Sequence, residues 1–455
     1  MLLVSGQMES YNIGKRRGAL HEIEDQLEVF RPITKWNGRA MTVEEIPELV
    51  HTAMQRISTG RPRPVEIEIH WDVLPATADI ELLEREVFPR QSPGPAEVRQ
   101  AAELLTEARF PLIWAGGGTR EAEVSDELLE LAQTINAPVI VTAQGKGAIP
   151  EDSPLFLGTY FYGHGPAHHA LPRADVILAV GSRLHLVPRT PWNIQPHQKV
   201  IQIDADPEEV GRNVPVSVGI TADGRLGVQA LLAELGGKTN SSQWISAEVA
   251  SIREQTRQEI QEMAPLQVEI IETMRRELDD DAIVVSGTTE IGYWSHLAFP
   301  VLRPRSYITP GYFATLGYAF PTALGAKVGN PNRQVVATSG DGGFMYASSE
   351  LATAVQEGIN VMVLVFNNGM LGASHSDQER HFGNRIIGTE LYNPDFARLA
   401  EVYGALGMKL SSHQELGDAL RSALRAQRPV LIEVPIPNLR PPFQIPPPGL
   451  EQVAR

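Results

Sequence analysis

The stretch QVVATSGDGG, residues 334–343, runs from an apolar strand into a glycine-rich turn, and a second apolar strand, VMVLVF, ends in Asn367-Asn368. The carboxyl ends of neighbouring parallel strands meet at one edge of a sheet, so Asp341 and Asn368 are expected to lie close together. Carboxylate and amide oxygens suit a hard divalent cation, and such a cation readily carries a diphosphate. The pairing predicts a cation and diphosphate site.

Three glycines in this turn support that prediction. Gly340, Gly342 and Gly343 leave room for the backbone to approach phosphate oxygens. The amphipathic stretch 347–357 is expected to form a helix whose first N–H groups point at the same phosphates. A Gly-Asp-Gly turn is common on its own, so the combination with the second strand carries the prediction.

The order of strand, Gly-Asp-Gly, helix, strand and Asn-Asn resembles the thiamine-diphosphate signature of the acetolactate synthase and 2-oxoacid decarboxylase superfamily. The resemblance covers most of the chain. It implies thiamine diphosphate and Mg²⁺ as cofactors. Asp341 and the side chain of Asn368 match the family's metal ligands, and Met370 matches the position that adds a backbone carbonyl.

The segment GYFATLGYAFPTALGAKVG, residues 311–329, resembles the family stretch in which a bulky apolar residue bends the cofactor. Leu316 stands at that position, and the bend lets the aminopyrimidine remove the thiazolium proton. By residue type alone Leu316 is an ordinary core leucine, and its spacing from Asp341 favours the cofactor role. The resemblance also implies cofactor contacts at Ala314, Leu371 and Gly372.

The loop after the strand AIVVS is expected to form another wall of the diphosphate site. Thr288 and Thr289 are predicted to donate hydroxyl hydrogen bonds to phosphate oxygens. Glu290 is included as a cofactor contact, although a carboxylate beside a diphosphate must point away or meet a cation.

The segment 367–385 covers the reactive end of the cofactor in relatives. Its polar side chains are candidates to supply a proton or to bind a substrate carboxylate, or are solvated loop residues: Ser374, His375, Arg380 and His381. His375 is named as a catalytic candidate. Acetolactate synthases carry a tryptophan where Asp377 stands, so the resemblance does not fix acetolactate formation.

Composition sets broad limits. The 455 residues, 42% of them hydrophobic, suffice for more than one buried core. No run of eighteen apolar residues and no secretory signal is found, so a cytoplasmic protein without a membrane partner is expected. Zero cysteines exclude disulfides and thiolate metal sites. The net charge of −16 argues against a nucleic-acid partner.

Strand and helix patterns alternate along the chain, which predicts an α/β fold of three doubly wound parallel-sheet units. The predicted division is a partial pyrimidine-binding domain at 1–74, a linker at 75–95, a Rossmann-like central domain at 96–236, a helical connector at 237–264, a thiamine-diphosphate-binding domain at 265–435 and a proline-rich, extended tail at 436–455.

Within these units the patterns predict particular elements. In the first unit they are strands at 2–6 and 65–70 and helices at 19–30 and 43–58, with RPITKWN linking the two helices. In the central unit they are strands at 111–116, 138–143, 175–181 and 199–204 and a helix at 123–135.

The first unit resembles only the second half of a pyrimidine-binding domain, so the family glutamate that hydrogen-bonds the aminopyrimidine is expected to be absent from this chain. The nearest carboxylates, Glu9, Glu22, Glu24 and Glu28, are interpreted as a solvated helix face. Three explanations stay open: an amino-terminal truncation, a second polypeptide that supplies the missing half, or a protein that binds the cofactor without efficient turnover.

The central unit contains Gly116-Gly117-Gly118 after a strand, without a full G-x-G-x-x-G spacing. The segment 181–187 matches a flavin-binding motif of acetolactate synthases at Gly181 and Arg183 but lacks the acidic pair that follows. FAD is therefore a possible cofactor, and a flavin-free relative is favoured.

Three histidines cluster at His164, His168 and His169. Two imidazoles four residues apart can share a helix face. Gly163, Gly165 and Pro166 interrupt such a helix, and no carboxylate completes a site, so no transition-metal site is predicted.

The resulting hypothesis is an acetolactate-synthase-like enzyme that decarboxylates or carboligates a small 2-oxoacid. Because family members share the cofactor between subunits, the resemblance implies a homodimer or homotetramer. The alternative is a cofactor-binding but catalytically incomplete subunit or fragment that needs a partner chain to supply the glutamate.

Overall fold

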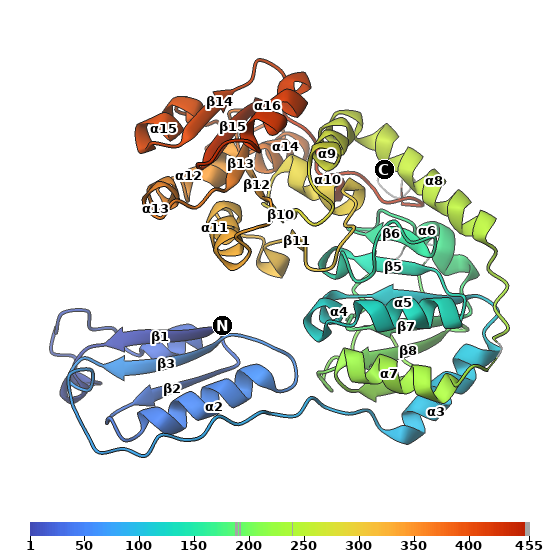
Figure 1. The fold of residues 1–455 in the computed structure, drawn as a ribbon, viewed down its shortest axis with the longest axis horizontal. Coiled ribbons are helices and arrows are strands. Elements are labelled where there is room, and N and C mark those ends of the chain that lie inside the picture. The colour runs from blue at the N-terminus through green and yellow to red at the C-terminus, as the bar shows by residue number, and fades with distance from the viewer. Residues whose placement is uncertain (187–189, 191–192, 239, 451–455) are drawn as a thin grey trace.

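The computed structural model describes the chain except residues 187–189, 191–192, 239 and 451–455. It is an α/β fold with three separate sheets, and every strand pairing within them is parallel, as predicted. The central unit lies beside each of the other two, which both extend to the same side of it (Figure 1). In the described part of the chain, no helix has the length and apolar character to cross a bilayer.

The amino-terminal unit has three strands in the order β1-β3-β2. Ala53 of α2 packs on the apolar face of β3, formed by Val65 and Ile67. The elements are β1 (Leu2–Gln7), η1 (Ser10–Asn12), α1 (Gln26–Phe30), β2 (Trp36–Ala40), α2 (Ile46–Ser58) and β3 (Val65–His70).

Two predictions for this unit are wrong. The segment RPITKWN leads directly into a strand, β2, whose polar residues and internal Gly38 give a weak strand pattern. The predicted helix 19–30 is helical only in its last five residues. His21 adopts a φ of 64°, which is incompatible with a continuous right-handed helix.

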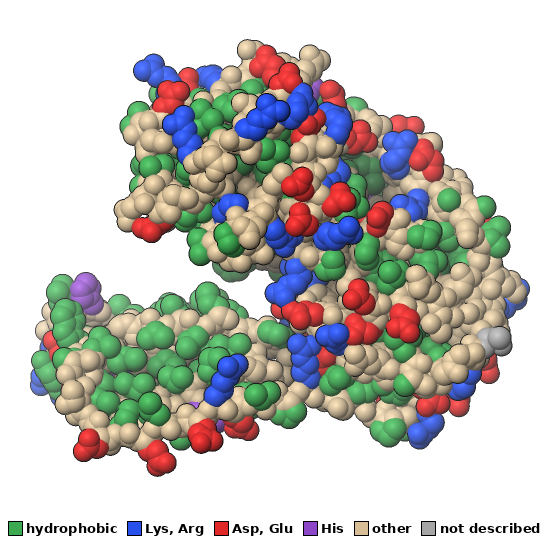
Figure 2. Space-filling view, in the orientation of Figure 1, with side chains coloured by type: hydrophobic (Ala, Val, Ile, Leu, Met, Phe, Trp, Pro, Cys, Tyr) green, Lys and Arg blue, Asp and Glu red, His purple; other side chains and the backbone are tan. Residues whose placement is uncertain are grey.

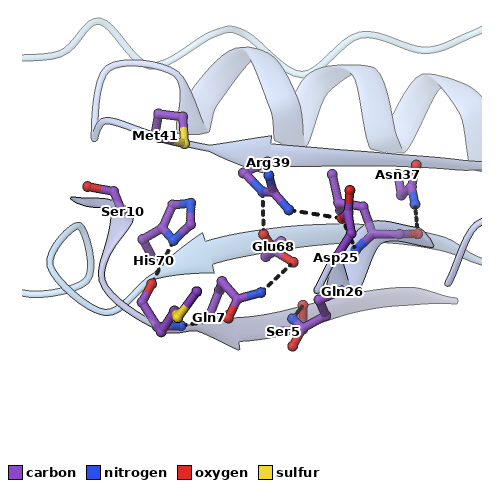
Figure 3. Close-up of polar contacts among 12 residues, drawn as sticks. Ser5, Gln7, Ser10, Asp25, Gln26, Asn37, Arg39, Met41, Glu68 and His70 are labelled. Carbon is purple, nitrogen blue, oxygen red and sulfur yellow. Dashed lines mark hydrogen bonds and ion pairs between the residues drawn. The ribbon is translucent and has the colours of Figure 1, made fainter. Parts of the chain in front are cut away.

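The opposite face of this small sheet carries buried polar side chains (Figure 3). Glu68 accepts hydrogen bonds from Arg39 and from Gln7 Nε2, the latter at 3.4 Å. Glu66 accepts a hydrogen bond from Ser5 Oγ at 2.5 Å, and burial raises the pKa of its carboxyl. These carboxylates therefore have partners inside the unit.

The central unit has six strands in the order β6-β5-β4-β7-β8-β9. Helices α3, α5 and α7 cover one face, and α6 and α8 (Ser246–Met263) pack on the other. Its elements are α3 (Pro95–Glu107), β4 (Pro111–Ala115), α4 (Gly117–Ala122), α5 (Ser125–Thr134), β5 (Val139–Thr142), η2 (Ala143–Gly145), β6 (Phe156–Tyr160), α6 (Ala167–Ala170), η3 (Leu171–Arg173), β7 (Val176–Val180), β8 (Lys199–Asp204), β9 (Val218–Thr221) and α7 (Gly224–Leu235).

The four predicted central strands and the predicted helix at 123–135 are present. The two outer strands, β6 and β9, were not predicted. Both are short and contain a glycine, Gly158 or Gly219, so they lack a continuous apolar run. Their pairing with inner strands of the sheet completes them.

The third unit also has six strands, in the order β11-β10-β12-β13-β15-β14, with helices on both faces. Helix α8 leads into it from the central unit (Figure 1). Its elements are α8 (Ser246–Met263), α9 (Pro265–Glu277), β10 (Ile283–Ser286), α10 (Glu290–Ala298), β11 (Tyr307–Ile308), η4 (Gly311–Phe313), α11 (Ala319–Gly329), β12 (Val335–Gly340), α12 (Asp341–Met345), α13 (Glu350–Gln356), β13 (Met362–Asn367), α14 (Gly372–His381), α15 (Phe396–Tyr403), β14 (Leu406–Lys409), η5 (His413–Glu415), α16 (Leu416–Ala423) and β15 (Val430–Pro435).

The central unit makes close polar contacts with both neighbours. Arg61 of the amino-terminal unit lies 2.9 Å from Glu209. On the other side, the buried pair Lys146 and Glu151 is 2.9 Å apart, and Glu151 also accepts a hydrogen bond from the backbone N–H of Val301 at 3.1 Å. The hydrogen bond between Glu151 and Val301 helps to fix the third unit, which carries the Gly-Asp-Gly turn, against the central unit.

The tail was predicted to be extended, and this is wrong for part of it. Residues 442–444 form a 3-10 turn, η6 (Pro442–Gln444). The Nε2 atom of His164 lies 3.0 Å from the carbonyl oxygen of Pro442 and 3.1 Å from that of Ile445. The tail thus packs against the central unit up to this point, and residues 451–455 of the predicted tail lie outside the described part.

Candidate active site

Asp341 lies where β12 ends and α12 begins, at the edge of the third sheet beside the end of β13. Its carboxylate is buried and accepts three hydrogen bonds: from Gly342 N at 2.9 Å, Gly369 N at 2.8 Å and Asn393 Nδ2 at 2.7 Å. These donors fix the direction of the carboxylate.

Asn368 lies in the turn that follows β13, and Gly369 makes this turn possible with a φ of 70°. Asn368 Oδ1 accepts a hydrogen bond from Met370 N at 3.2 Å, and its Nδ2 donates to Glu290 Oε1 at 3.2 Å. Because Gly369 N also bonds Asp341, the turn joins the two side chains predicted as metal ligands into one cluster.

The helix that begins at the Gly-Asp-Gly turn differs from the predicted one. The prediction placed a helix at 347–357, with its amino end directed at the phosphates. In the structure α12 begins at Asp341 itself, and a separate helix, α13, covers 350–356. The N–H groups nearest the turn therefore belong to α12, a helix too short to show an amphipathic pattern.

A side chain at either of two glycines here would displace neighbouring side chains. A Cβ on Gly342 would lie 2.7 Å from Leu371 Cδ2. A Cβ on Gly372 would lie 1.9 Å from Glu290 Oε1 and 2.9 Å from Asn368 Nδ2.

The loop between β10 and α10 places Thr288, Thr289 and Glu290 beside this cluster. The hydroxyl of Thr289 is buried, has no hydrogen-bond partner of normal geometry, and lies 3.4 Å from the Cβ position of Gly340. Burial, with a further contribution from Asp341, raises the pKa of Glu290 to about 7. A cation held at Asp341 would offset the repulsion between these two carboxylates.

The segment with Ala314 and Leu316 lies against the same loop. Thr288 Oγ1 donates a hydrogen bond to the carbonyl oxygen of Ala314 at 3.1 Å. Ala314 adopts a φ of 49°, a left-handed conformation that costs energy for a residue with a Cβ. Half-buried Leu316 has its Cδ2 3.7 Å from the Cβ position of Gly343, so it lies next to the Gly-Asp-Gly turn.

The polar candidates of 367–385 mostly lie on α14 and have partners elsewhere. His375 Nδ1 lies 3.0 Å from Thr389 Oγ1. Arg380 donates to the carbonyl oxygen of Gln444 at 2.7 Å, and Asp377 accepts a hydrogen bond from Gln444 Nε2 at 2.9 Å. Ser374 and His381 are exposed.

Sequence reasoning missed residues that support the cluster from a distance in the chain. Asn393 Nδ2 donates to Asp341 and also to Asn367 Oδ1, at 2.9 Å. Asn367 Nδ2 in turn donates to Glu433 Oε1 at 2.9 Å. The Asn-Pro-Asp sequence at 393–395 is a turn signal, but it gives no indication of the partner.

Of the four carboxylates expected on a solvated helix of the first unit, Glu28 alone lies on an α-helix, where it is exposed. Glu22 accepts hydrogen bonds from backbone N–H groups, including Ala19 N at 2.9 Å, and closes a turn. Glu28 is on α1 and pairs with Arg31 across its end, at 2.5 Å. Figure 2 shows a hollow between this unit and the third unit.

A cavity of about 600 Å³ lies at the carboxyl ends of the central strands and is also lined by Arg61 of the first unit and Tyr312 of the third. Gly116, Gly117 and Gly118 line it together with Asp204 and Arg183, whose guanidinium lies 4.5 Å from the ring centre of Tyr312. The predicted flavin motif at 181–187 contributes Gly181 to Arg183, and its Val187 lies outside the described residues.

Comparisons with known proteins assign the central and third units to known domain families. Residues 287–434 match the family model "Thiamine pyrophosphate enzyme, C-terminal TPP binding domain", and residues 98–231 match "Thiamine pyrophosphate enzyme, central domain". The chain is 33% identical to a probable acetolactate synthase large subunit of Methanocaldococcus jannaschii, over 99% of this chain and 79% of that protein.

Two further relatives differ in their described activity. The probable 2-ketoarginine decarboxylase AruI of Pseudomonas aeruginosa is 33% identical over 95% of this chain and 78% of its own length. The acetolactate synthase large subunit of Haemophilus influenzae is 32% identical over 93% of this chain and 76% of its own length.

The chain is therefore an enzyme of the thiamine pyrophosphate class. Within that class it belongs to the acetolactate synthase and 2-oxoacid decarboxylase superfamily.

Proposed function

We propose that this enzyme holds thiamine diphosphate through Mg²⁺ at Asp341, Asn368 and the backbone carbonyl of Met370, and acts on a small 2-oxoacid. The observation that carries the proposal is the buried Asp341 carboxylate, joined to the Asn368 turn through Gly369 N at 2.8 Å. Two oxygen-bearing side chains at one sheet edge form a donor set that suits Mg²⁺.

The residues present fit a diphosphate. The glycines that leave no space for a Cβ allow backbone N–H groups to approach phosphate oxygens closely. The buried Thr289 hydroxyl without a normal partner is placed to donate to such an oxygen. The start of α12 adds N–H groups at the same place.

Each group in the cluster has a separate role in this proposal. Thiamine diphosphate, when bound, supplies a carbon nucleophile and an electron sink for decarboxylation or carboligation of the 2-oxoacid. Asp341 and Asn368 orient the cation, and Asn393 holds Asp341 in place. Leu316, beside Gly343, would support the bound cofactor and help to exclude water from the site.

The substrate is proposed only as a 2-oxoacid. The relatives include acetolactate synthases, which give a carboligation, and a probable 2-ketoarginine decarboxylase. Asp377, which stands in place of the tryptophan of acetolactate synthases, accepts a hydrogen bond from Gln444 Nε2. His375 is proposed as a proton donor, with Thr389 fixing its ring orientation.

An alternative is a cofactor-binding subunit or fragment that needs a further chain or segment to supply the glutamate. It is favoured by the partners of the first unit's carboxylates, because Glu66 and Glu68 are buried against Ser5 and Arg39 and Glu22 closes a turn. A carboxylate from elsewhere would promote the tautomer that deprotonates the thiazolium.

Assembly and a second cofactor are further parts of the proposal. Exposed aromatic residues Tyr312, Phe313 and Tyr346 border the Leu316 segment and suit burial against a second copy, in a homodimer or homotetramer.

The central cavity, with glycines at the start of α4 and Asp204 at the end of β8, suits a dinucleotide such as FAD.

Calorimetry with thiamine diphosphate tests the cation site. Binding is expected with Mg²⁺ and little binding with a chelator. Asp341→Ala should weaken cofactor binding by about 100-fold, which corresponds to one strong charge-assisted contact. Equal affinity with and without Mg²⁺, or unchanged affinity in Asp341→Ala, would contradict the proposal.

Carbon dioxide release and proton exchange at the thiazolium carbon separate the two functional hypotheses. If a carboxylate must come from elsewhere, the chain alone should bind the cofactor but react slowly. Adding an amino-terminal segment that bears the glutamate, in cis or as a separate chain, should then raise the rate by about 10²–10⁴-fold. A chain that exchanges the proton equally fast without it contains its own functional carboxylate.

A further inference from the structure

Two neighbouring histidines of α6 and one glutamate of α8 come together on the side of the central unit. The Nε2 atom of His169 lies 2.9 Å from Glu259 Oε1, and that of His168 lies 3.2 Å from Glu259 Oε2. The two imidazole ring centres are 3.8 Å apart. The prediction that no carboxylate completes a site at these histidines is therefore wrong, because Glu259 is brought to them from 90 residues further along the chain.

We propose that His168, His169 and Glu259 form a binding site for a divalent transition metal of the Zn²⁺ type, separate from the oxygen-ligand site at Asp341. All three residues offer ligand atoms that lie within 4.8 Å of one another. Two imidazole nitrogens and one carboxylate oxygen are ligands that Zn²⁺ prefers, and a water molecule can take the fourth position.

The two distances from the histidines to Glu259 suit a shared ion, and the ligand nitrogens of the two histidines lie within 4.8 Å of each other. Two ligands about 2.0–2.1 Å from a tetrahedral zinc ion lie about 3.3 Å from each other. The two contacts from Nε2 to Glu259 are 2.9 Å and 3.2 Å. Small adjustments of side chains that are 11%, 24% and 36% exposed would accommodate the ion.

The hydrogen bonding of His168 gives an independent argument. Its Nδ1 lies 2.9 Å from the carbonyl oxygen of Gly165, which can only accept, so Nδ1 carries the proton. In the neutral ring, Nε2 then has a lone pair that faces the Glu259 carboxylate. Either a second proton or a cation must separate these two acceptors.

A metal ion satisfies both acceptors at once, and the two imidazole rings lie close enough to serve it together, with centres 3.8 Å apart and planes tilted by 42°. The bond from Nδ1 to Gly165 is also the kind of backbone contact that fixes the tautomer of a metal-ligating histidine.

The location gives the ion a structural consequence. Glu259 lies near the end of α8, which runs from the central unit to the third unit, whereas both histidines lie on the short helix α6 (Figure 1). A bound ion would tie these helices together and stabilise the junction that positions the third unit.

Titration of the full chain with ZnCl₂ tests the site. Calorimetry is performed with thiamine diphosphate and excess Mg²⁺ present, so that the oxygen-ligand site is already filled. We expect one equivalent of Zn²⁺ to bind and the unfolding temperature to rise. In a parallel experiment, Co²⁺ should give the strong visible absorption of a tetrahedral site.

Glu259→Gln and His169→Gln should each weaken Zn²⁺ binding by at least about 100-fold. Loss of a group that only supports a ligand already costs up to about 100-fold in metal affinity, and these variants remove a ligand itself. His413→Gln is the matched control, because His413 faces a single carboxylate, Glu269, at 3.5 Å and should keep full affinity. Circular dichroism checks that each variant is folded. The proposal is overturned if the wild-type chain binds no Zn²⁺, or if both site variants bind it as tightly as His413→Gln does.

Discussion

Replacing Gly372 by alanine should disturb the cofactor site with little effect on the rest of the fold. Gly372 is the first residue of α14 and its φ lies outside the left-handed region, so its backbone accepts alanine. The new Cβ would lie 1.9 Å from Glu290 Oε1, 2.5 Å from Asn438 Oδ1 and 2.9 Å from Asn368 Nδ2.

The size of the effect follows from these distances. Glu290 Oε1 must retreat by about 1.5 Å to reach an ordinary contact of about 3.4 Å. That movement breaks its hydrogen bond with Asn368 Nδ2, which is 3.2 Å long, and releases a proposed metal ligand. Misplacement of about 1 Å can cost about 10²-fold in function. The displaced atoms are ends of side chains, so the stability cost should stay near the lower end of about 1–3 kcal/mol.

Gly325→Ala is the matched control. Gly325 lies inside α11, and a Cβ there meets nothing within 4 Å. Alanine should stabilise this helix by about 0.5–1 kcal/mol and leave the cofactor site unchanged.

Calorimetry with thiamine diphosphate and Mg²⁺, together with urea unfolding, measures both effects. Gly372→Ala should bind the cofactor about 10–100-fold more weakly than Gly325→Ala, in line with the cost of a misplaced contact. Equal cofactor affinity in the two variants would refute the reasoning, because it would show that the position of Asn368 does not matter.

Two other substitutions test the site and the core. Thr289→Val keeps the shape but removes the buried hydroxyl; calorimetry should show cofactor affinity about 10–100-fold lower, while urea unfolding shows the cofactor-free protein no less stable. Burial, then the charge of Lys146, lowers the pKa of His296 from its ordinary value of 6.5 to about 3, so its neutral form is favoured by folding. Above pH 6.5 this histidine is neutral in both the folded and the unfolded protein, so it does not make stability depend on pH. Below pH 6.5 the unfolded protein takes up the proton first, and the free energy of unfolding falls by about 1.4 kcal/mol per pH unit as the pH drops toward 3. His296→Phe should reduce the loss of stability between pH 7 and pH 5 in urea unfolding, and an unchanged loss would count against this account.

Local patterns in the sequence were sufficient for the inner strands and for the main pair of site residues. Strands such as β7 and β13 are continuous apolar runs because helices cover both faces of their sheets, and such runs are visible in one dimension. Asp341 and Asn368 each follow such a strand, so their proximity could be deduced from the rule that parallel strands end at one edge.

Other elements needed their neighbours. Strand β2 has five residues with a central glycine, and it forms a strand because β3 supplies its hydrogen-bond partners. The expected helix 347–357 is present only as α13, at 350–356, and a separate helix, α12, already begins at Asp341. Propensity over a few residues is too weak to fix such boundaries.

The sequence by itself determined the alternation of strands and helices, the Gly-Asp-Gly turn and the asparagine pair, because each depends on residues close together in the chain. Only the tertiary structure decided that Asn393 holds Asp341, that Glu290 faces Asn368, and that Glu259 meets two histidines. Those contacts join residues 52, 78 and 90 positions apart. Their partners are chosen by how the sheets and helices pack, and no local pattern records that choice.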